Sequence, residues 1–308
     1  MALGRRGLFI AAAAATAGAV AVAVVRGRAR KLRRAHPVLE GGPLLIAHRG
    51  GSALAPENTL PAFLSAARTW GADMMELDVH ATADGHCVVI HDATVDRTSD
   101  GSGAVADMSL AQLSEFDAGY HFTRDGGVTF PFRAKGVRVP SIVEVFEALP
   151  EMRYTIEVKH GSAQRPLFDA IERFGVAHRV VAAGMYDRDR TQFARHRGAV
   201  SASTEQARTF ITAHRLHVER FIATPFDVVQ LPETHNGNRV VTPRLVRALH
   251  RRGIPLHVWT VNEAADMERL LDWGIDGIVT DRPDILGRVL HGRAGRPLAV
   301  GHAETTGP

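Results

Sequence analysis

Short apolar runs alternate with amphipathic stretches along the chain from about residue 44 onward. Alternation of this kind is typical of βα units that surround a parallel sheet. Nine runs are predicted as strands: 44–47, 74–79, 88–91, 154–158, 180–183, 200–202, 228–231, 256–260 and 278–280. Helical periodicity between the runs predicts helices at 59–69, 141–148, 165–173, 243–251 and 263–271.

The number of runs and one short link indicate an irregular barrel. A (β/α)8 barrel has eight strands, so one of the nine runs is expected to lie outside it. Between the second and third runs there is only a turn at Asp84 and Gly85, which predicts a bare loop or a hairpin. Thr59 and Asn262 suit helix N-termini. The fold class expected is α/β, an irregular (β/α)8 TIM barrel preceded by a hydrophobic helix.

Periodicity weakens between residues 93 and 140, where glycines interrupt the pattern and aromatic residues are interspersed. A loop-rich insertion of this composition usually packs over another part of the domain. The organisation expected is a hydrophobic anchor or signal segment with a basic linker at 1–42 and a barrel domain at 43–292. The insertion falls at about 93–140, and a C-terminal tail follows at 293–308.

The N-terminal segment contains a hydrophobic stretch that can just span a membrane. Residues 8–25 are eighteen without a charge, about 27 Å long as a helix, which is roughly one hydrocarbon core. An uncleaved single-pass anchor is favoured over a cleaved secretory or twin-arginine signal and over a surface-lying segment. Arg5 and Arg6 resemble an export signal, whereas six basic residues between 26 and 34 favour a cytoplasmic body. The side of the membrane therefore stays open.

The charge distribution argues against a nucleic-acid partner. The formal net charge is +4, but eight basic residues lie before residue 35, and without them the body carries −4. The body also shows no basic stripe interleaved with aromatic residues.

Cys87, the single cysteine, lies in an apolar run and is expected to be a buried hydrophobe rather than a reactive thiol. The oligomeric state is not indicated.

Charged residues gather at the ends of predicted strands, where the catalytic groups of a barrel collect. His48 and Arg49 follow the first run, although a histidine at a strand end is by itself more often structural. Glu76 and Asp78 are two residues apart and share one face of their strand. If the apolar residues between and after them pack against helices, these carboxylates point into the barrel, where a cation would neutralise their repulsion. An exposed strand face with solvated acids is the alternative.

Two further strand ends complete a set of groups suited to phosphodiester cleavage. Glu157 and Lys159 repeat the two-residue spacing, and His91 ends the run 88–91. A third carboxylate would complete an all-oxygen site of the kind that Ca²⁺ or Mg²⁺ prefers. Two imidazoles can supply an acid and a base, and the arginine and lysine can neutralise phosphoryl oxygens.

Several short motifs are weak signals alone but occur here in a particular order and spacing. They are His48-Arg49-Gly50, Pro56-Glu57-Asn58-Thr59, Glu76-Leu77-Asp78-Val79, Asp84-Gly85, His91-Asp92 and Glu157-Val158-Lys159. Together they resemble the glycerophosphodiester phosphodiesterase family. The likeness covers about residues 44–290 and ends with Val258-Trp259-Thr260-Val261-Asn262 and Thr280-Asp281-Arg282-Pro283.

The resemblance implies a distorted (β/α)8 barrel and gives roles to the matching residues. One divalent cation, Ca²⁺ or Mg²⁺, would be held by Glu76, Asp78 and Glu157. The acid/base pair would be His48 and His91, and Arg49 and Lys159 would meet the phosphate.

Three further residues also match the family. Glu57 would lie near the substrate, where it could support the metal or orient His48, and a plain charge at a helix N-terminus is the alternative. Trp259 would form a wall beside the substrate or belong to the core. Asp281 would fall at the end of the last strand and hold a loop.

The activity implied is hydrolysis of glycerophosphodiesters to glycerol 3-phosphate and an alcohol. The hydrophobic stretch at 8–25, which lies outside the likeness, separately predicts that the enzyme is membrane-associated. A lysophospholipase D acting on membrane lysophospholipids is a second hypothesis, motivated by the hydrophobic segment and the phenylalanines of the insertion. A non-catalytic, membrane-tethered protein that binds phosphodiester headgroups is a third, and it would have no need of two histidines. The alcohol, the identity of the cation and the choice between direct hydrolysis and a cyclic intermediate stay open.

Overall fold

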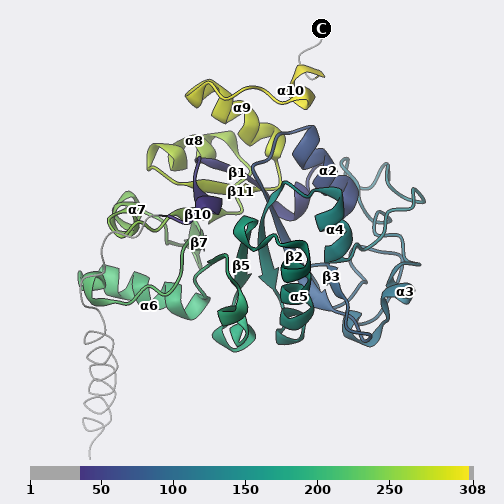
Figure 1. The fold of residues 1–308 in the computed structure, drawn as a ribbon. Coiled ribbons are helices and arrows are strands. Elements are labelled where there is room, and N and C mark those ends of the chain that lie inside the picture. Colours follow the sequence, from purple (N-terminus) through teal and green to yellow (C-terminus); the bar gives the residue numbers. More distant parts are fainter. Residues whose placement is uncertain (1–34, 305–308) are drawn as a thin grey trace, which may run out of the picture.

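A computed structural model describes residues 35–304 of the chain. Eight parallel strands form one curled sheet in the order β6, β5, β4, β2, β1, β11, β10, β7 (Figure 1). A parallel bridge between Ser201 and Val228 joins its two ends. The architecture is therefore TIM-barrel-like. The bounds are β1 Leu44–Ala47, β2 Met74–Ala81, β4 Arg153–Val158, β5 Val180–Gly184, β6 Ala199–Val200, β7 Val229–Pro232, β10 Leu256–Trp259 and β11 Gly277–Thr280.

The strand outside the parallel set is β3, Cys87–Val89. It pairs antiparallel with β2 through the turn at Asp84 and Gly85, so of the bare loop and the hairpin that the short link allowed, the hairpin is formed. Each of the nine predicted runs contains a strand, and the run 88–91 is the one that leaves the barrel pattern. A two-stranded hairpin of β8 Thr234–His235 and β9 Asn238–Arg239 follows β7.

Helices cover the outer face of the sheet (Figure 1). The five predicted helices are present, and α6 and α9 are two longer helices that the hydrophobic pattern does not single out. The bounds are α2 Leu60–Arg68, α3 Leu110–Leu113, α4 Ile142–Ala148, α5 Gln164–Phe174, α6 Thr204–Arg215, α7 Pro243–His250, α8 Ala264–Asp272, α9 Pro283–Ala294 and α10 Val300–Glu304. Thr59 caps α2 as expected, whereas Glu263 and not Asn262 occupies the cap position of α8.

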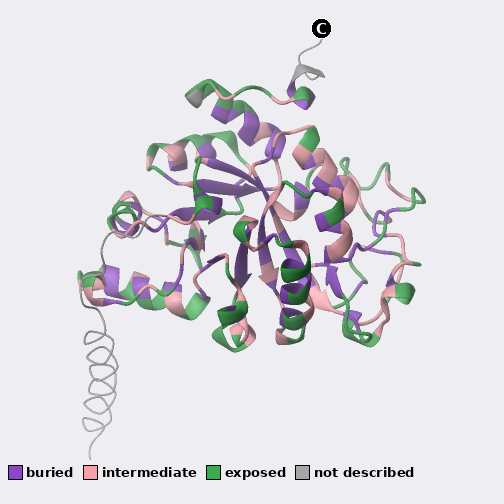
Figure 2. Cartoon of the chain, in the orientation of Figure 1, coloured by how far each residue is buried: buried purple, intermediate pink, exposed green. Residues whose placement is uncertain are grey.

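The main hydrophobic core lies between the sheet and these helices. Leu77 and Val79 of β2 are fully buried there, in one cluster with Phe63 of α2 and Phe146 of α4. Figure 2 shows buried strands at the centre and helices whose outer faces are exposed. Because successive strand residues point to opposite faces, Glu76 and Asp78 face the barrel interior, as the sequence predicts.

A second cluster fills the end of the barrel at which the strands begin. It combines interior residues of the strands with Val38 and Leu39 from the 3₁₀ turn Pro37–Leu39, which are 2% and 3% exposed. Arg153 at the start of β4 donates to the carbonyl oxygens of Val38 and Glu40 at 3.2 and 2.8 Å. The turn Pro37–Leu39 therefore closes the floor of the barrel, and its opposite end carries the loops that follow the strands.

The insertion and the C-terminal residues both pack on the barrel. Residues of the insertion form their own small core, which includes Val88 and Ile90 beside the β2–β3 hairpin. In the stretch predicted as a tail, Arg296 pairs with Asp73 at 2.6 Å, and buried His302 meets the ring of Trp70 edge on.

The hydrophobic helix predicted at 8–25 lies outside the described residues. Within residues 35–304, no helix combines the length and the apolar character that crossing a bilayer requires.

Candidate active site

Three carboxylates meet at the rim where the barrel strands end. Glu76 and Asp78 come from β2 and Glu157 from the adjacent β4, in a register that places Asp78 opposite Glu157. One oxygen of each lies within 4.8 Å of the others, and Asp78 is 1% exposed. The sequence-based expectation of a carboxylate cluster is therefore confirmed as geometry. Three carboxylates without sulfur or nitrogen ligands suit a hard cation such as Ca²⁺ or Mg²⁺.

The charge around this cluster is unevenly balanced. Burial raises the pKa of Glu76 to about 7, and the negative charge of Asp78 adds to the effect. Burial also acts to raise the pKa of Asp78, but Lys159 and Arg49 outweigh it and hold that pKa below its usual value. Lys159 Nζ lies 2.8 Å from Asp78 Oδ1 and 3.1 Å from Glu157 Oε2. The ionised form of Glu76 is thus poorly compensated by the described residues, and a bound cation would stabilise it, which supports a metal at this position.

His48 is anchored on one side by a carboxylate. Its Nδ1 lies 2.6 Å from Asp281 Oδ1, and its Nε2 lies 3.9 Å from Glu76 Oε2. Asp281 has a pKa of about 2, because bonds from His48, Ser52 and Asn262 outweigh its burial. It is therefore an ionised acceptor, so His48 Nδ1 carries the proton and Nε2 faces the carboxylate cluster. Burial lowers the pKa of His48, but Asp281 and Glu76 more than offset this and leave it raised.

His91 has a similar anchor. Its Nδ1 lies 2.6 Å from Asp92 Oδ1, and the bond from Arg97 together with that from His91 holds the pKa of Asp92 at about 2. The proton consequently sits on His91 Nδ1, and Nε2 is left for chemistry. The two predicted histidines thus share one arrangement, an imidazole fixed through Nδ1 by an ionised aspartate.

The His48-Arg49-Gly50 turn after β1 brings Arg49 to the cluster through its backbone as well as its side chain. Arg49 adopts a left-handed conformation with φ 50°, and its N–H donates to Glu76 Oε2 at 2.9 Å. Gly50 has φ 84°, and a Cβ there would lie 2.8 Å from the side chain of Ala62. A side chain at position 50 would therefore push the turn away from α2. Arg49 Nε ends 3.3 Å from Asp78 Oδ2.

Glu57 and Asn58 support this turn from the segment that precedes α2. Glu57 Oε1 accepts from Arg49 Nη1 at 2.9 Å, and Asn58 Nδ2 donates to Asp78 Oδ2 at 3.0 Å. The bonds of Glu57 in the described part of the chain go to Arg49 and Arg97, so it orients arginines rather than His48. Contact between Glu57 and substrate stays a prediction.

Trp259 at the end of β10 is 40% exposed, which shows that its ring is not part of the core. Val258, the residue before it, packs in the core between the sheet and the helices. Because successive strand residues point to opposite faces, Trp259 lies on the face of β10 that points into the barrel. No hydrogen bond or ion pair among residues 35–304 joins it to the other site residues. Its predicted place beside the substrate therefore rests on the rim position alone.

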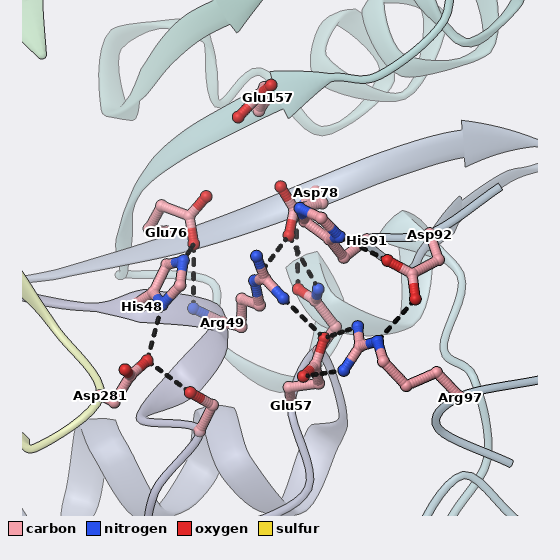
Figure 3. Close-up of polar contacts among 12 residues, drawn as sticks. His48, Arg49, Glu57, Glu76, Asp78, His91, Asp92, Arg97, Glu157 and Asp281 are labelled. Atoms are coloured by element: carbon pink, nitrogen blue, oxygen red, sulfur yellow. Dashed lines mark hydrogen bonds and ion pairs between the residues drawn. The ribbon is translucent and has the colours of Figure 1, made fainter. Parts of the chain in front are cut away.

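Sequence reasoning missed several residues that hold the site. Asp281 was expected to hold a loop, and it holds His48. Asn262 was expected at a helix N-terminus, but its Nδ2 donates to Asp281 Oδ2 at 2.8 Å. Asp92 and Arg97 were given no role, although Arg97 bonds both Asp92 and Glu57 (Figure 3). The sequence indicated a role for Arg97 only through its position, five residues after Asp92 of the His91-Asp92 motif.

Comparison with known proteins agrees with this geometry. Residues 48–285 match the model of the glycerophosphoryl diester phosphodiesterase family. The chain belongs to this family. The matched range begins at His48 and includes every residue of the site described above.

Individual relatives support the assignment along most of the domain. A glycerophosphodiester phosphodiesterase of Caldanaerobacter subterraneus subsp. tengcongensis is 36% identical over 254 residues, which cover 79% of this chain and 96% of that protein. Among solved structures, the glycerophosphoryl diester phosphodiesterase domain of a Mycobacterium tuberculosis protein aligns with a TM-score of 0.71 at 20% identity, covering 82% of this chain and all of that domain. An Oleispira antarctica phosphodiesterase in complex with the product sn-glycerol-3-phosphate aligns with a TM-score of 0.62 at 21% identity, covering 80% and 96%. At these identities, the two structures show the shared fold.

Proposed function

We propose that this family member hydrolyses glycerophosphodiesters to glycerol 3-phosphate and an alcohol, with His48 and His91 as acid and base and one Ca²⁺ or Mg²⁺ held by Glu76, Asp78 and Glu157. The observation that carries the proposal is the placement of two aspartate-anchored imidazoles beside a three-carboxylate cluster. The eight parallel strands and the bridge at Ser201 support an irregular (β/α)8 barrel as their scaffold.

The described residues account for proton transfer and for charge on the phosphate. Each Nδ1 is committed to an aspartate, so each histidine exchanges protons through Nε2. One imidazole takes a proton from the nucleophile, and the other returns one to the leaving alkoxide. Arg49 and Lys159 add positive charge where the phosphoryl oxygens would lie. When bound, the cation would supply further neutralisation of phosphoryl charge.

Neither alternative function gains support. A headgroup-binding protein has no use for two imidazoles with fixed tautomers, and the relatives named above are phosphodiesterases. The lysophospholipase D hypothesis has no observation of its own in the described residues.

Release of glycerol 3-phosphate tests the proposed function directly. Purified protein is incubated with glycerophosphocholine and other glycerophosphodiesters, and with lysophosphatidylcholine, with and without a chelator. We expect glycerol 3-phosphate from the water-soluble diesters in the presence of Ca²⁺ or Mg²⁺. A protein that releases none from any diester with either cation would refute the assignment.

We also propose that residues 8–25 anchor the enzyme to a membrane, supported by the uncharged stretch of eighteen residues and the basic residues behind it. Each basic side chain at an anionic lipid surface is worth about 1 kcal/mol. No residue proposed for catalysis lies before His48, so the anchor is separable from the chemistry.

Deleting residues 1–34 is expected to move the enzyme from the membrane fraction to the soluble fraction with unchanged activity on glycerophosphocholine. Deleting residues 1–42 also removes Val38 and Leu39 from the floor of the barrel and should destabilise the domain by at least about 3 kcal/mol, since one buried leucine is typically worth about 2–5 kcal/mol. Fractionation, activity and chemical denaturation of the two truncations check both statements. A soluble full-length protein, or a mature chain that begins after residue 25, would contradict the anchor.

A further inference from the structure

Arg97, at the start of the insertion, joins two motifs that are distant in the sequence (Figure 3). Its Nη1 and Nη2 donate to the two carboxylate oxygens of Glu57 at 2.8 and 2.7 Å. Its Nε donates to Asp92 Oδ2 at 2.6 Å. All three nitrogens of one planar group therefore hold carboxylates, and these belong to the Pro56-Glu57-Asn58-Thr59 and His91-Asp92 motifs.

The contact with Asp92 leads to one of the two histidines. Asp92 Oδ1 accepts from His91 Nδ1, and Oδ2 accepts from Arg97. Both oxygens are occupied, so the carboxylate cannot rotate without losing a charge-assisted bond. Arg97 thus fixes the acceptor that orients the His91 ring.

The contact with Glu57 leads to the other half of the site. Glu57 Oε1 also accepts from Arg49, and Arg49 Nε reaches Asp78. The bond from Arg97 and the charge of Arg49 together outweigh burial and lower the pKa of Glu57. Glu57 is therefore an ionised bridge between two guanidinium groups: Arg97 donates to both of its oxygens, and Arg49 shares Oε1.

We propose that Arg97 is a positioning residue that aligns His91 with Arg49 across the active site, through Asp92 on one side and Glu57 on the other. The inference rests on the proposed function, because it concerns how the groups assigned there are held. It also gives a role to the beginning of the insertion, because Arg97 lies there and joins the Glu57 side of the site to the His91 side. Arg97 acts through its two carboxylate partners, and no hydrogen bond or ion pair joins it to Glu76 or Glu157 in the described part of the chain.

The geometry requires an arginine at this position. The Arg97 side chain is 49% exposed, whereas that of Glu57 is 16% exposed, so one half-exposed side chain organises a more buried carboxylate. A lysine would keep the positive charge but has a single nitrogen, which cannot occupy both oxygens of Glu57 and Asp92 Oδ2 in this fork. Charge and geometry can therefore be separated by substitution.

The test compares full-length wild type with R97A, R97K and R124A. Arg124 lies in the same insertion, where its guanidinium donates to the carbonyl oxygen of Leu54 and lies over Phe122. Among the described residues it takes part in none of the hydrogen bonds that join Glu57, Arg97 and Asp92. Measurements are kcat and KM on glycerophosphocholine, the melting temperature, and cation affinity by calorimetry. We expect R97A to lower kcat/KM by about 10- to 100-fold, since misplacement of a reacting group by about 1 Å has effects of this size. Cation affinity should stay at the wild-type value, and R124A should behave as wild type.

The conservative variant and a mutant cycle separate positioning from stability. R97K is expected to recover the melting temperature of wild type without recovering kcat. R97A combined with D92N or E57Q should lose less than the product of the single losses, because the substitutions interrupt the same link. Wild-type kinetics in R97A, or recovery of kcat and melting temperature together in R97K, would overturn the inference. A wild-type enzyme that cleaves no glycerophosphodiester would instead refute the proposed function.

Discussion

Replacing His48 or His91 by alanine is expected to lower kcat by at least about 10²-fold with the fold intact, because positioned proton transfer typically contributes about 10²- to 10⁴-fold. The reason lies in the anchors. Each Nδ1 is fixed by an ionised aspartate at 2.6 Å, so each Nε2 is directed into the site and no other described group takes its place. Steady-state kinetics on glycerophosphocholine, with circular dichroism to confirm folding, measure the effect.

Two further variants show whether the loss is specific. H178A serves as a matched control, because His178 is exposed in the 3₁₀ turn Ala177–Arg179 that precedes β5, at the floor end of the barrel. D281N should lower kcat less than H48A does, since it leaves the imidazole in place and removes the charge that fixes its proton on Nδ1. If alanine at both histidines costs less than tenfold, the assignment of the acid/base pair is wrong.

Removal of divalent cations is expected to lower kcat/KM by at least about 10²-fold. A cation on a phosphoryl oxygen is worth several kcal/mol, and about 1.4 kcal/mol corresponds to a tenfold change in rate. The site contains six carboxylates and three permanent cations, so positive charge is scarce without a metal. The carboxylates are Glu57, Glu76, Asp78, Asp92, Glu157 and Asp281, and the cations are Arg49, Arg97 and Lys159.

Cation binding can be measured without activity. At a free concentration 100 times Kd, binding adds about 2.7 kcal/mol to stability, which for a domain of this size raises Tm by roughly 5 to 10 °C. Glu76 has a pKa raised to about 7 by burial and by Asp78, so part of the protein holds a proton there that the cation must displace. The raised pKa of nearby His48 acts in the same direction. Affinity should therefore increase as pH rises from about 6 to 8.

Calorimetry at the two pH values and thermal unfolding of chelated and reloaded protein check these statements. E157Q provides a matched substitution, since it removes one ligand charge without changing β4 packing on the helix side. Full activity after exhaustive chelation, or a Tm that does not respond to either cation, would contradict the proposed metal site.

The sequence predicted those parts of the structure that depend on local periodicity. Strand alternation placed Glu76 and Asp78 on the interior face on the condition that Leu77 and Val79 pack against helices, and the structure meets that condition. The short link at Asp84 and Gly85 predicted a bare loop or a hairpin, and the structure forms the hairpin. The same reasoning placed Glu157 on the same rim, since carboxyl ends of parallel strands meet there.

Contacts between distant segments could not be predicted in this way. Asp281 lies 233 residues after His48, and Arg97 lies 40 residues after Glu57. Asparagine suits a helix cap and a bridging amide equally well, so the side chain of Asn262 gave no indication that it would hold Asp281. The insertion has no periodicity, and without it the direction in which Arg97 points depends on the tertiary fold.

The turn Pro37–Leu39 also determines how a tethered enzyme would face its surroundings. It closes the floor of the barrel, so any preceding segment joins the domain at the end opposite the catalytic rim. Residues 26–36, fully extended, would reach at most about 40 Å, whereas a domain of this size is roughly 48 Å across. The segment 26–36 is therefore too short for the domain to turn its catalytic rim toward the membrane. If residues 8–25 anchor the enzyme as proposed, the mouth of the barrel would open toward the aqueous phase, and diffusible diesters would reach it without passing the lipid surface.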